Sequence, residues 1–277
     1  MTIPELGFGT ATIMGRVSRS AGTAALERAL AAGVRHFDTA RSYGWGEAER
    51  VVGNALRKHR REDLRIVTKC GILPVRNTPL LGLAKSVARS LLAFAPGLKA
   101  QVRRVASSES FQPVHTYEIE SLAGSLKTSL DELGVSYIDD LLLHNFSAER
   151  PGLEEVGAWF RDLQRSGTIR RFGFSVEGDL LQGLEHLARK DLLADAVVQV
   201  PVSDTLLALP REWRGVRFIA HSPFGFMRRQ NDLGGPLTSL KALIPALGEA
   251  CRCDALVCSM FGADHLTDNV TAWKSCS

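Results

Sequence analysis

Four polar side chains follow or end short apolar runs of the sequence, where they could act together on a carbonyl group. Asp38 ends "HFD", Tyr43 follows five residues later, Lys69 lies in "IVTKC", and His144 follows "LLL". A free tyrosine has a pKa of about 10, too high to give up a proton readily near neutral pH. A nearby ammonium ion lowers that pKa because it stabilises the phenolate. We therefore expect Lys69 to activate Tyr43 as a proton donor.

Asp38 and His144 would complete this group. A buried ammonium needs a carboxylate partner to stay charged, which Asp38 would supply to Lys69. His144 would donate a hydrogen bond to a carbonyl oxygen and fix its orientation. Each residue alone has an ordinary explanation, because Asp38 could cap a helix and Tyr43 could pack. Likewise, Lys69 could reach solvent and His144 could be a core histidine. Together they predict a site that polarises a carbonyl while another group delivers hydride.

The elements that would carry these residues alternate between short apolar strands and amphipathic helices. This alternation is typical of parallel β/α units, whose working residues gather at the C-terminal ends of the strands. The predicted strands are Leu6–Ala11, His36–Asp38, Leu64–Thr68, Asp139–Leu143, Arg171–Ser175, Ala196–Val200, Arg217–Ala220 and Ala255–Cys258. Eight strands close a barrel, so we predict an α/β fold of the (β/α)8 TIM-barrel class, with residues 1–277 in a single domain.

Two helices have recognisable ends. The segment "AGTAALERALAAG" predicts a helix with Ser20 as its N-cap and Gly33 at its end. The segment "EIESLAGSLKTSLDELG" repeats leucine at helical spacing and predicts a helix that stops at Gly134.

The connection from Pro74 to His115 is too long for a simple link between a strand and a helix. It is rich in lysine and arginine and follows the third predicted strand, so it would emerge on the working face of the barrel. We expect this insertion, at about residues 74–115, to be a lid that closes over the substrate and attracts an anionic group. A variable surface excursion or a helix on a membrane surface are the alternatives. Deleting it should raise KM without abolishing cofactor binding.

Composition narrows the function classes. A chain of 277 residues with 23% charged residues and a net charge of +4 indicates a water-soluble globular protein. No apolar run approaches the length of a membrane span, and "MTIPELGFG" does not read as a secretory signal, so we expect a cytoplasmic location. The basic run "KHRRED" at Lys58 to Asp63 is expected to be a solvated turn, with no nucleic acid as partner. Five cysteines without C-x-x-C spacing predict free thiols, and no metal site is expected.

Longer motifs around the four residues resemble the aldo/keto reductase superfamily. They are "GFGTA", "GVRHFDTARSYGWGEAERVVGNAL" from Gly33 to Leu56, "VTKCG", "YIDDLLLHNF", "GFSV", "VVQV" and "GADHLTDNV". The resemblance covers nearly the whole chain and implies a (β/α)8 barrel with an NAD(P)-dependent oxidoreductase activity. It implies that Asp38, Tyr43, Lys69 and His144 form a catalytic tetrad, with Tyr43 as the general acid in reduction and the general base in oxidation.

The same resemblance implies a set of cofactor-binding positions. Ser175 and Gln199 would hold the nicotinamide carboxamide, His221 would stack on the nicotinamide, and the loop from Ser222 to Phe226 would lie along the pyrophosphate. The full expected set is Ser175, Gln199, His221, Ser222, Phe224, Ser259, Phe261, His265 and Asn269. Trp45 would wall the substrate pocket or pack beneath its loop.

The chain departs from the pattern at several of these positions. Val176 replaces the asparagine that usually follows the serine, and Ser259 and His265 replace the cations that grip a 2′-phosphate in NADP-preferring relatives. The cofactor is therefore expected to be NADP or NAD, with Arg228 or Arg229 as possible substitutes for the missing cations. Asn269 would contact the adenine.

Three functions remain in competition. The leading one is an oxidoreductase that reduces aldehydes or ketones or oxidises sugars or alcohols, with a small-molecule carbonyl or sugar as substrate. The second is a regulatory barrel that binds nucleotide with little turnover, but such a barrel has no need of Tyr43 and Lys69 together. The third is an aldolase-like barrel in which Lys69 forms a Schiff base, although Asp38 would keep Lys69 protonated.

Overall fold

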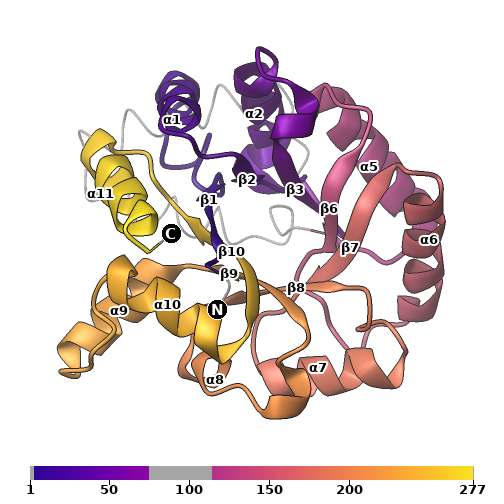
Figure 1. Ribbon diagram of the computed structural model, residues 1–277. Helices are drawn as coiled ribbons and strands as arrows, with labels where there is room; N and C mark the ends of the chain where they lie inside the picture. The colour runs from indigo at the N-terminus through magenta and orange to yellow at the C-terminus, as the bar shows by residue number, and fades with distance from the viewer. Residues whose placement is uncertain (1–2, 75–113, 277) are drawn as a thin grey trace, which may run out of the picture.

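The computed structural model describes residues 3–74 and 114–276. Eight parallel strands form a closed barrel, and each strand pairs with its neighbours in chain order around the ring (Figure 1). The strands are β1 (Glu5–Gly9), β2 (His36–Asp38), β3 (Arg65–Cys70), β6 (Ile138–Leu143), β7 (Ile169–Ser175), β8 (Val197–Pro201), β9 (Arg217–His221) and β10 (Arg252–Cys258). The predicted (β/α)8 barrel is confirmed, and every predicted strand is present with its ends shifted by a few residues.

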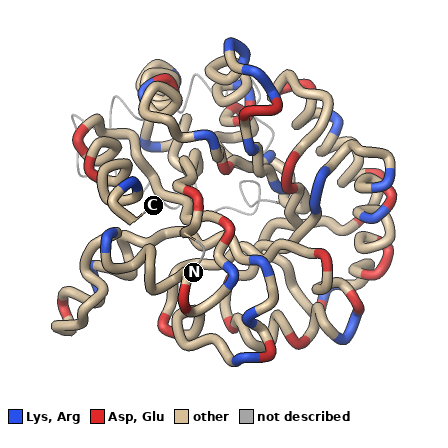
Figure 2. Tube along the Cα trace, viewed as in Figure 1, with Lys and Arg blue, Asp and Glu red and all other residues tan. Residues whose placement is uncertain are grey.

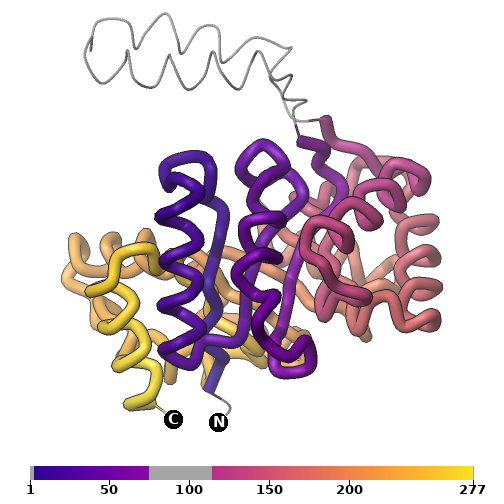
Figure 3. The backbone as a smooth tube through the Cα atoms, turned by 90° about the horizontal axis from the view of Figure 1, so that it is seen from above, coloured from indigo at the N-terminus to yellow at the C-terminus, as the bar shows by residue number. Residues whose placement is uncertain are grey.

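Helices surround the barrel. They are α1 (Arg19–Ala31), α2 (Ala48–Leu56), α5 (Ile119–Leu133), α6 (Leu153–Arg165), α7 (Leu180–Arg189), α8 (Asp204–Leu207), α9 (Pro223–Asp232), α10 (Leu240–Ala250) and α11 (Ala263–Lys274). Figure 3 shows α1, α2 and α5 standing side by side, with α11 next to α1. Each strand therefore has its outer face covered by apolar helical surface, which accounts for the near-continuous burial of β3, β6 and β8.

Two helix ends test the capping predictions. The helix α5 ends as expected at Gly134, which adopts the left-handed conformation with a φ of 68°. The predicted N-cap of α1 was wrong, because Ser18 rather than Ser20 is the capping residue. Ser18 has extended backbone angles, and its side chain accepts a hydrogen bond from the backbone N–H of Ala21. The helix therefore begins at Arg19.

The long connection after β3 lies mostly outside the described residues, so the prediction of a lid over residues 74–115 stays a prediction. At its ends, β4 (Ile72–Leu73) and β5 (Val114–His115) form a short antiparallel pair that the sequence did not indicate. This pair lies just beyond β3 and just before α5, so the connection leaves and returns at one place on the C-terminal side of the barrel.

Alternate side chains on each strand point into the barrel, so residues two apart along a strand lie in successive layers. The lowest layer is charged: Arg65 and Arg171 both contact Asp140, at 2.9 and 2.7 Å, and Arg171 also contacts Asp254 at 2.9 Å. Above it lies a separate apolar cluster formed by Val67, Leu142, Val197, Ile219, Ala255 and Val257. The next inward position on β3 is Lys69, so the chemistry-bearing side chains lie above the apolar layer.

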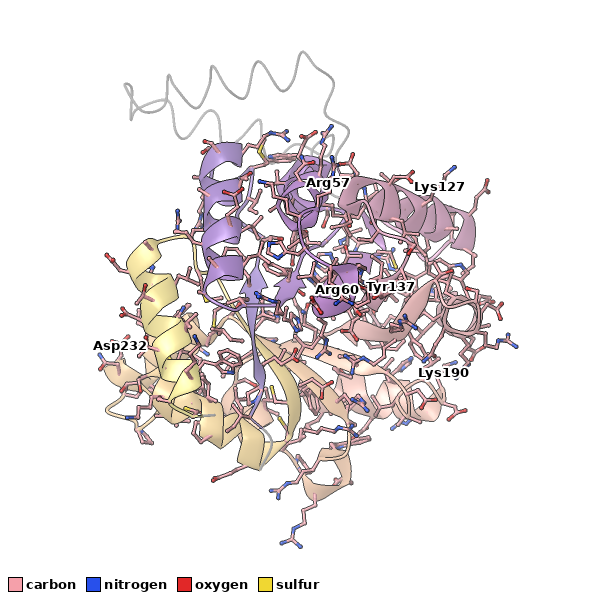
Figure 4. All side chains as sticks on the ribbon, turned by 45° about the horizontal axis from the view of Figure 1, so that its top comes forward. Arg57, Arg60, Lys127, Tyr137, Lys190 and Asp232 are labelled. Carbon is pink, nitrogen blue, oxygen red and sulfur yellow. The ribbon has the colours of Figure 1, made fainter. Side chains whose placement is uncertain are left out.

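The basic run before β3 is a turn, as predicted. Lys58, His59 and Arg60 are exposed, whereas Arg61 is partly buried and donates to the carbonyl of Tyr137 and to the Asp139 carboxylate. Figure 4 labels Arg57, Arg60 and Tyr137 around this turn. Figure 2 shows positions of basic and acidic residues interspersed along the ring of helices, which agrees with a solvated surface.

Candidate active site

The buried ammonium of Lys69 lies at the centre of the candidate site. Its Nζ donates hydrogen bonds to Asp38 Oδ1 at 2.7 Å, to the carbonyl of Thr39 at 2.9 Å and to the hydroxyl of Tyr43 at 3.3 Å. Three acceptors match the three protons of an ammonium ion. Only 1% of Lys69 is exposed, yet each of its donors has a partner among the described residues.

The charge on Lys69 is well supported. Burial alone would lower its pKa, but the Asp38 carboxylate, Tyr43 and their hydrogen bonds together raise the pKa of Lys69 above its usual value. Gln199 also donates from Nε2 to Asp38 Oδ2 at 2.7 Å, so both carboxylate oxygens have partners. A lysine held protonated in this way is a poor amine nucleophile, which disfavours the Schiff-base alternative.

The expected effect of Lys69 on Tyr43 is outweighed in this structure. Burial raises the pKa of Tyr43, the Lys69 charge lowers it, and Asp38 raises it, and the sum is a pKa above the usual value. The prediction of a lowered pKa was therefore wrong in its net direction, because desolvation of the phenolate exceeds the attraction of one ammonium that Asp38 partly neutralises. Tyr43 is accordingly protonated near neutral pH, which is the form a general acid requires.

His144 completes the group from the end of β6. Its ring lies edge-on to that of Tyr43, with centroids 5.6 Å apart, and its Nδ1 is 3.4 Å from the Ser42 hydroxyl. Burial, with the nearby charge of Lys69, lowers the pKa of His144 to about 3, so the ring is neutral at neutral pH. If the Ser42 hydroxyl donates to Nδ1, the ring proton resides on Nε2, where it can be donated to a carbonyl oxygen.

The loop that carries Tyr43 is held in place by a buried ion pair between Arg41 and Glu49. Glu49 is fully buried and accepts from Arg41 at 2.7 Å and from the Thr68 hydroxyl at 2.6 Å. Arg41 also donates to the carbonyl of Gly46 at 3.0 Å. Between these contacts the short turn η1 (Tyr43–Gly46) passes through the left-handed region at Gly44, where a Cβ would lie 2.7 Å from a backbone oxygen. Through Arg41 and Thr68, Glu49 therefore links the Tyr43 loop to the residue that precedes Lys69 on β3.

A pocket opens above these side chains. The described residues that line it are Gly9, Ala11, Asp38, Tyr43, His144, Ser175, Glu177, Gln199, His221, Ser222, Pro223, Phe224, Val257, Cys258 and Ser259. They come from strand ends on both sides of the barrel, although the residues are far apart in sequence. Within the described ranges, no group of three or more His, Cys, Asp or Glu side chains is arranged to hold a metal ion.

Comparison with known proteins decides the family. A model of the aldo/keto reductase family matches residues 5–243. The chain belongs to the aldo/keto reductase family. Asp38, Tyr43 and His144 line one pocket, and Lys69 is hydrogen-bonded to Asp38 and Tyr43. The assignment of these four residues as a catalytic tetrad stays a prediction.

The curated relatives are named for different activities, which include a sugar dehydrogenase and a methylglyoxal reductase. The chain is 37% identical over 215 residues to D-threo-aldose 1-dehydrogenase of Pseudomonas sp. This alignment covers 70% of this chain and 56% of the relative. It is 25% identical over 249 residues to the NADH-specific methylglyoxal reductase of Escherichia coli, and this alignment covers 86% of this chain and 68% of the relative. Three other curated relatives are matched over only 38% to 53% of their length, so the chain spans about half of them.

A solved aldo/keto reductase from Klebsiella pneumoniae, in complex with NADP and acetate, has the same fold. The superposition has a TM-score of 0.62 at 21% identity and covers 98% of this chain and 86% of the other. The likeness to solved structures at this identity supports the barrel architecture alone.

In this aldo/keto reductase, most of the expected cofactor positions line the pocket. They are Ser175, Gln199, His221, Ser222, Phe224 and Ser259. The expected loop from Ser222 to Phe226 is instead the first turn of α9, because Pro223 occupies the first helical position after a left-handed Ser222. Arg228 and Arg229 lie further along that helix and are exposed.

The other expected positions are not among the described residues that line the pocket. Phe261 packs edge-on against Phe8 with centroids 5.0 Å apart, and His265 is exposed on α11. Asn269 is buried, and its Nδ2 has no hydrogen-bond partner in the described part of the chain. Trp45, with 39% of its surface exposed, lies beyond Tyr43 in the left-handed region. These positions stay predictions.

Sequence reasoning missed two features of this family member. Glu177 lines the pocket two residues after Ser175, and the Arg41–Glu49 pair braces the Tyr43 loop. Arg41 and Glu49 lie inside the motif from Gly33 to Leu56, and Glu177 directly follows the motif "GFSV". An acidic residue just beyond a strand end is the signal that could have identified Glu177. In addition, within the described part of the protein, no helix is long and apolar enough to cross a membrane.

One buried and one partly buried histidine, His144 and His221, predict acid sensitivity of the fold. Burial, offset partly by Asp38, lowers the pKa of His221 to about 4, and that of His144 is about 3, whereas an unfolded histidine titrates near 6.5. Between those values the unfolded chain binds more protons, so stability falls as the pH drops below about 6.5. We expect each histidine to contribute a slope of about 1.4 kcal/mol per pH unit. Urea unfolding from pH 7 to 4.5 should show a shallower slope in His144→Asn and in His221→Asn, and identical slopes would contradict this account.

Proposed function

We propose that the protein is an NAD(P)-dependent oxidoreductase that reduces aldehydes or ketones, or oxidises sugar or alcohol substrates, by direct hydride transfer. The observation that carries the proposal is the position of the Lys69 ammonium between the Asp38 carboxylate, at 2.7 Å, and the Tyr43 hydroxyl, at 3.3 Å, below a pocket. This arrangement supplies a proton donor whose conjugate base is stabilised by a fixed positive charge. Proton exchange at an oxygen atom is what carbonyl reduction requires of the protein.

In the direction of reduction, Tyr43 donates its phenol proton to the carbonyl oxygen of the substrate. The phenolate that remains is stabilised by Lys69, which Asp38 keeps charged. His144, neutral at neutral pH, donates a second hydrogen bond to the same oxygen and holds the carbonyl in place. In oxidation, the Tyr43 phenolate removes the proton from the alcohol.

The pocket residues fit a nicotinamide cofactor. The Nε2 atom of Gln199 is engaged by Asp38, so its Oε1 is left to accept from an amide donor such as a carboxamide NH2. Ser175 would hold the same group, and the unpartnered Nδ2 of Asn269 is suited to a ring nitrogen of adenine. When bound, the cofactor exchanges hydride directly with the carbonyl carbon. The relatives point in both directions on its identity, since one is named NADH-specific and another is solved with NADP.

The test is the absorbance of reduced nicotinamide over time, with NADH and NADPH in parallel and a reactive aromatic aldehyde as the acceptor. We expect oxidation with at least one cofactor, and the ratio of the two rates gives the preference. The Tyr43→Phe variant is the control, because its fold and pocket should be retained. Measurable nucleotide binding without oxidation of either cofactor would replace this proposal by the regulatory barrel.

A further inference from the structure

One exposed carboxylate on the pocket wall is not among the groups proposed to donate or accept the transferred proton. Glu177 follows the end of β7 and lines the same pocket as Tyr43, His144 and Gln199. It forms no ion pair with the described residues, and its Oε2 accepts a hydrogen bond from Asn145 Nδ2 at 3.3 Å. One carboxylate oxygen is therefore available to a ligand.

Asn145 ties this carboxylate to the proposed chemistry. It directly follows His144 and is held in the left-handed region, with a φ of 50°, so its side chain reaches Glu177 on the neighbouring strand end. Its Oδ1 is buried and has no hydrogen-bond partner among the residues that the structure describes. Asn145 therefore holds the Glu177 carboxylate at the wall of the pocket that Tyr43 and His144 also line.

The charges around the pocket do not cancel. Asp38 and Lys69 neutralise each other at 2.7 Å, and the pKa values of His144 and His221, lowered by burial, leave both rings neutral near pH 7. The described lining residues include no arginine, and their remaining charged group is Glu177. The described lining of the pocket therefore carries a net negative charge near pH 7, located on the Glu177 carboxylate.

We propose that Glu177 selects the substrate class of this site, favouring neutral carbonyl compounds that carry hydroxyl groups and disfavouring those that carry a carboxylate. A hydroxyl group near Glu177 donates to the free carboxylate oxygen, and a charge-assisted hydrogen bond of this kind is stronger than a neutral one. A carboxylate in the same place is repelled and brings no donor. This inference rests on the proposed oxidoreductase function and names the substrate preference of the same pocket.

The test compares three aldehydes of similar size: 3-(hydroxymethyl)benzaldehyde, 3-methylbenzaldehyde and 3-carboxybenzaldehyde. We expect the wild-type kcat/KM to be highest for the hydroxymethyl compound and lowest for the carboxylate. In Glu177→Gln the ratio of the hydroxymethyl to the carboxylate value should fall about fivefold, as is typical of one partly screened charge. In Glu177→Lys the carboxylate should become the better substrate of the two.

A control variant and the dependence on ionic strength show whether the change in the kcat/KM ratio is caused by the charge of Glu177 or by a change in structure. Glu27→Gln makes the same change of charge on the exposed side of α1 and should leave the ratio unchanged. Raising the salt concentration should shrink the wild-type preference and leave that of Glu177→Gln nearly constant. Equal ratios in the wild type and Glu177→Gln, with turnover intact, would overturn this inference and leave the proposed function standing. Absence of turnover with all three aldehydes in the wild type would overturn both.

Discussion

Replacing Tyr43 by phenylalanine should lower kcat for aldehyde reduction by about two to four orders of magnitude, the usual contribution of a positioned general acid. The phenylalanine ring occupies nearly the same volume but cannot donate a proton, and the Tyr43 hydroxyl is the group that Lys69 contacts at 3.3 Å. Binding of NADPH or NADH, followed by fluorescence titration, should change little, because the predicted cofactor contacts are elsewhere. The loss therefore appears in kcat.

Tyr117→Phe is the matched control for this experiment. The Tyr117 hydroxyl accepts from the backbone N–H of Ser147 at 2.8 Å and is partly buried, but Tyr117 is not among the described residues that line the pocket. Its replacement should cost some stability and leave kcat close to that of the wild type. A Tyr43→Phe enzyme that keeps more than about a tenth of the wild-type kcat would refute the assignment of Tyr43 as the general acid.

Lys69→Met should destabilise the protein by about 3–5 kcal/mol, as is usual when one partner of a buried ion pair is removed. The Asp38 carboxylate, 4% exposed, would keep Gln199 as a donor but lose its counter-charge. The double variant Asp38→Asn/Lys69→Met removes both charges and should recover a large part of that loss. Urea unfolding at pH 7 gives the free energies of unfolding for the wild type, both single variants and the double variant.

The coupling in this double-mutant cycle is the informative quantity. A pair in direct contact should give a non-additive term of at least about 1 kcal/mol, and the double variant should be more stable than Lys69→Met alone. Simple additivity of the two single effects would show that the pair does not hold the site together. All three variants should lack carbonyl reduction, because the proton donor then has no stabilised conjugate base.

The barrel and the proximity of the four polar side chains were predictable because both depend on a simple spacing. Parallel strands place successive inward side chains two residues apart, so Asp38, Lys69 and His144 at strand ends meet wherever a barrel closes. The same periodicity puts Arg65, Val67 and Lys69 on one face of β3. The alternation of side chains along β3 therefore also predicts that Arg65 lies in a layer below Lys69, where it contacts Asp140.

The features that the sequence did not indicate depend on interaction energies and backbone angles, which cannot be inferred from the spacing of residues. The net pKa of Tyr43 is a balance between desolvation and two opposite charges, and this balance depends on burial. Ser18 and Ser20 are equally good capping residues by type, and the choice between them depends on backbone angles. The family pattern predicts a loop from Ser222 to Phe226, whereas the preference of proline for the first helical turn favours the helical start that is found at Pro223.

The apolar layer in the middle of the barrel keeps two sets of charged side chains out of direct contact. Val67, Leu142 and Ile219 lie between the ion pairs of Asp140 and Asp254 below and the Lys69–Asp38 pair above. Charges on the lower side can therefore be re-paired to adjust heat tolerance without breaking a contact of the upper pair. Because an apolar medium screens charge poorly, such a change still acts on the protonation of the upper pair through the electric field.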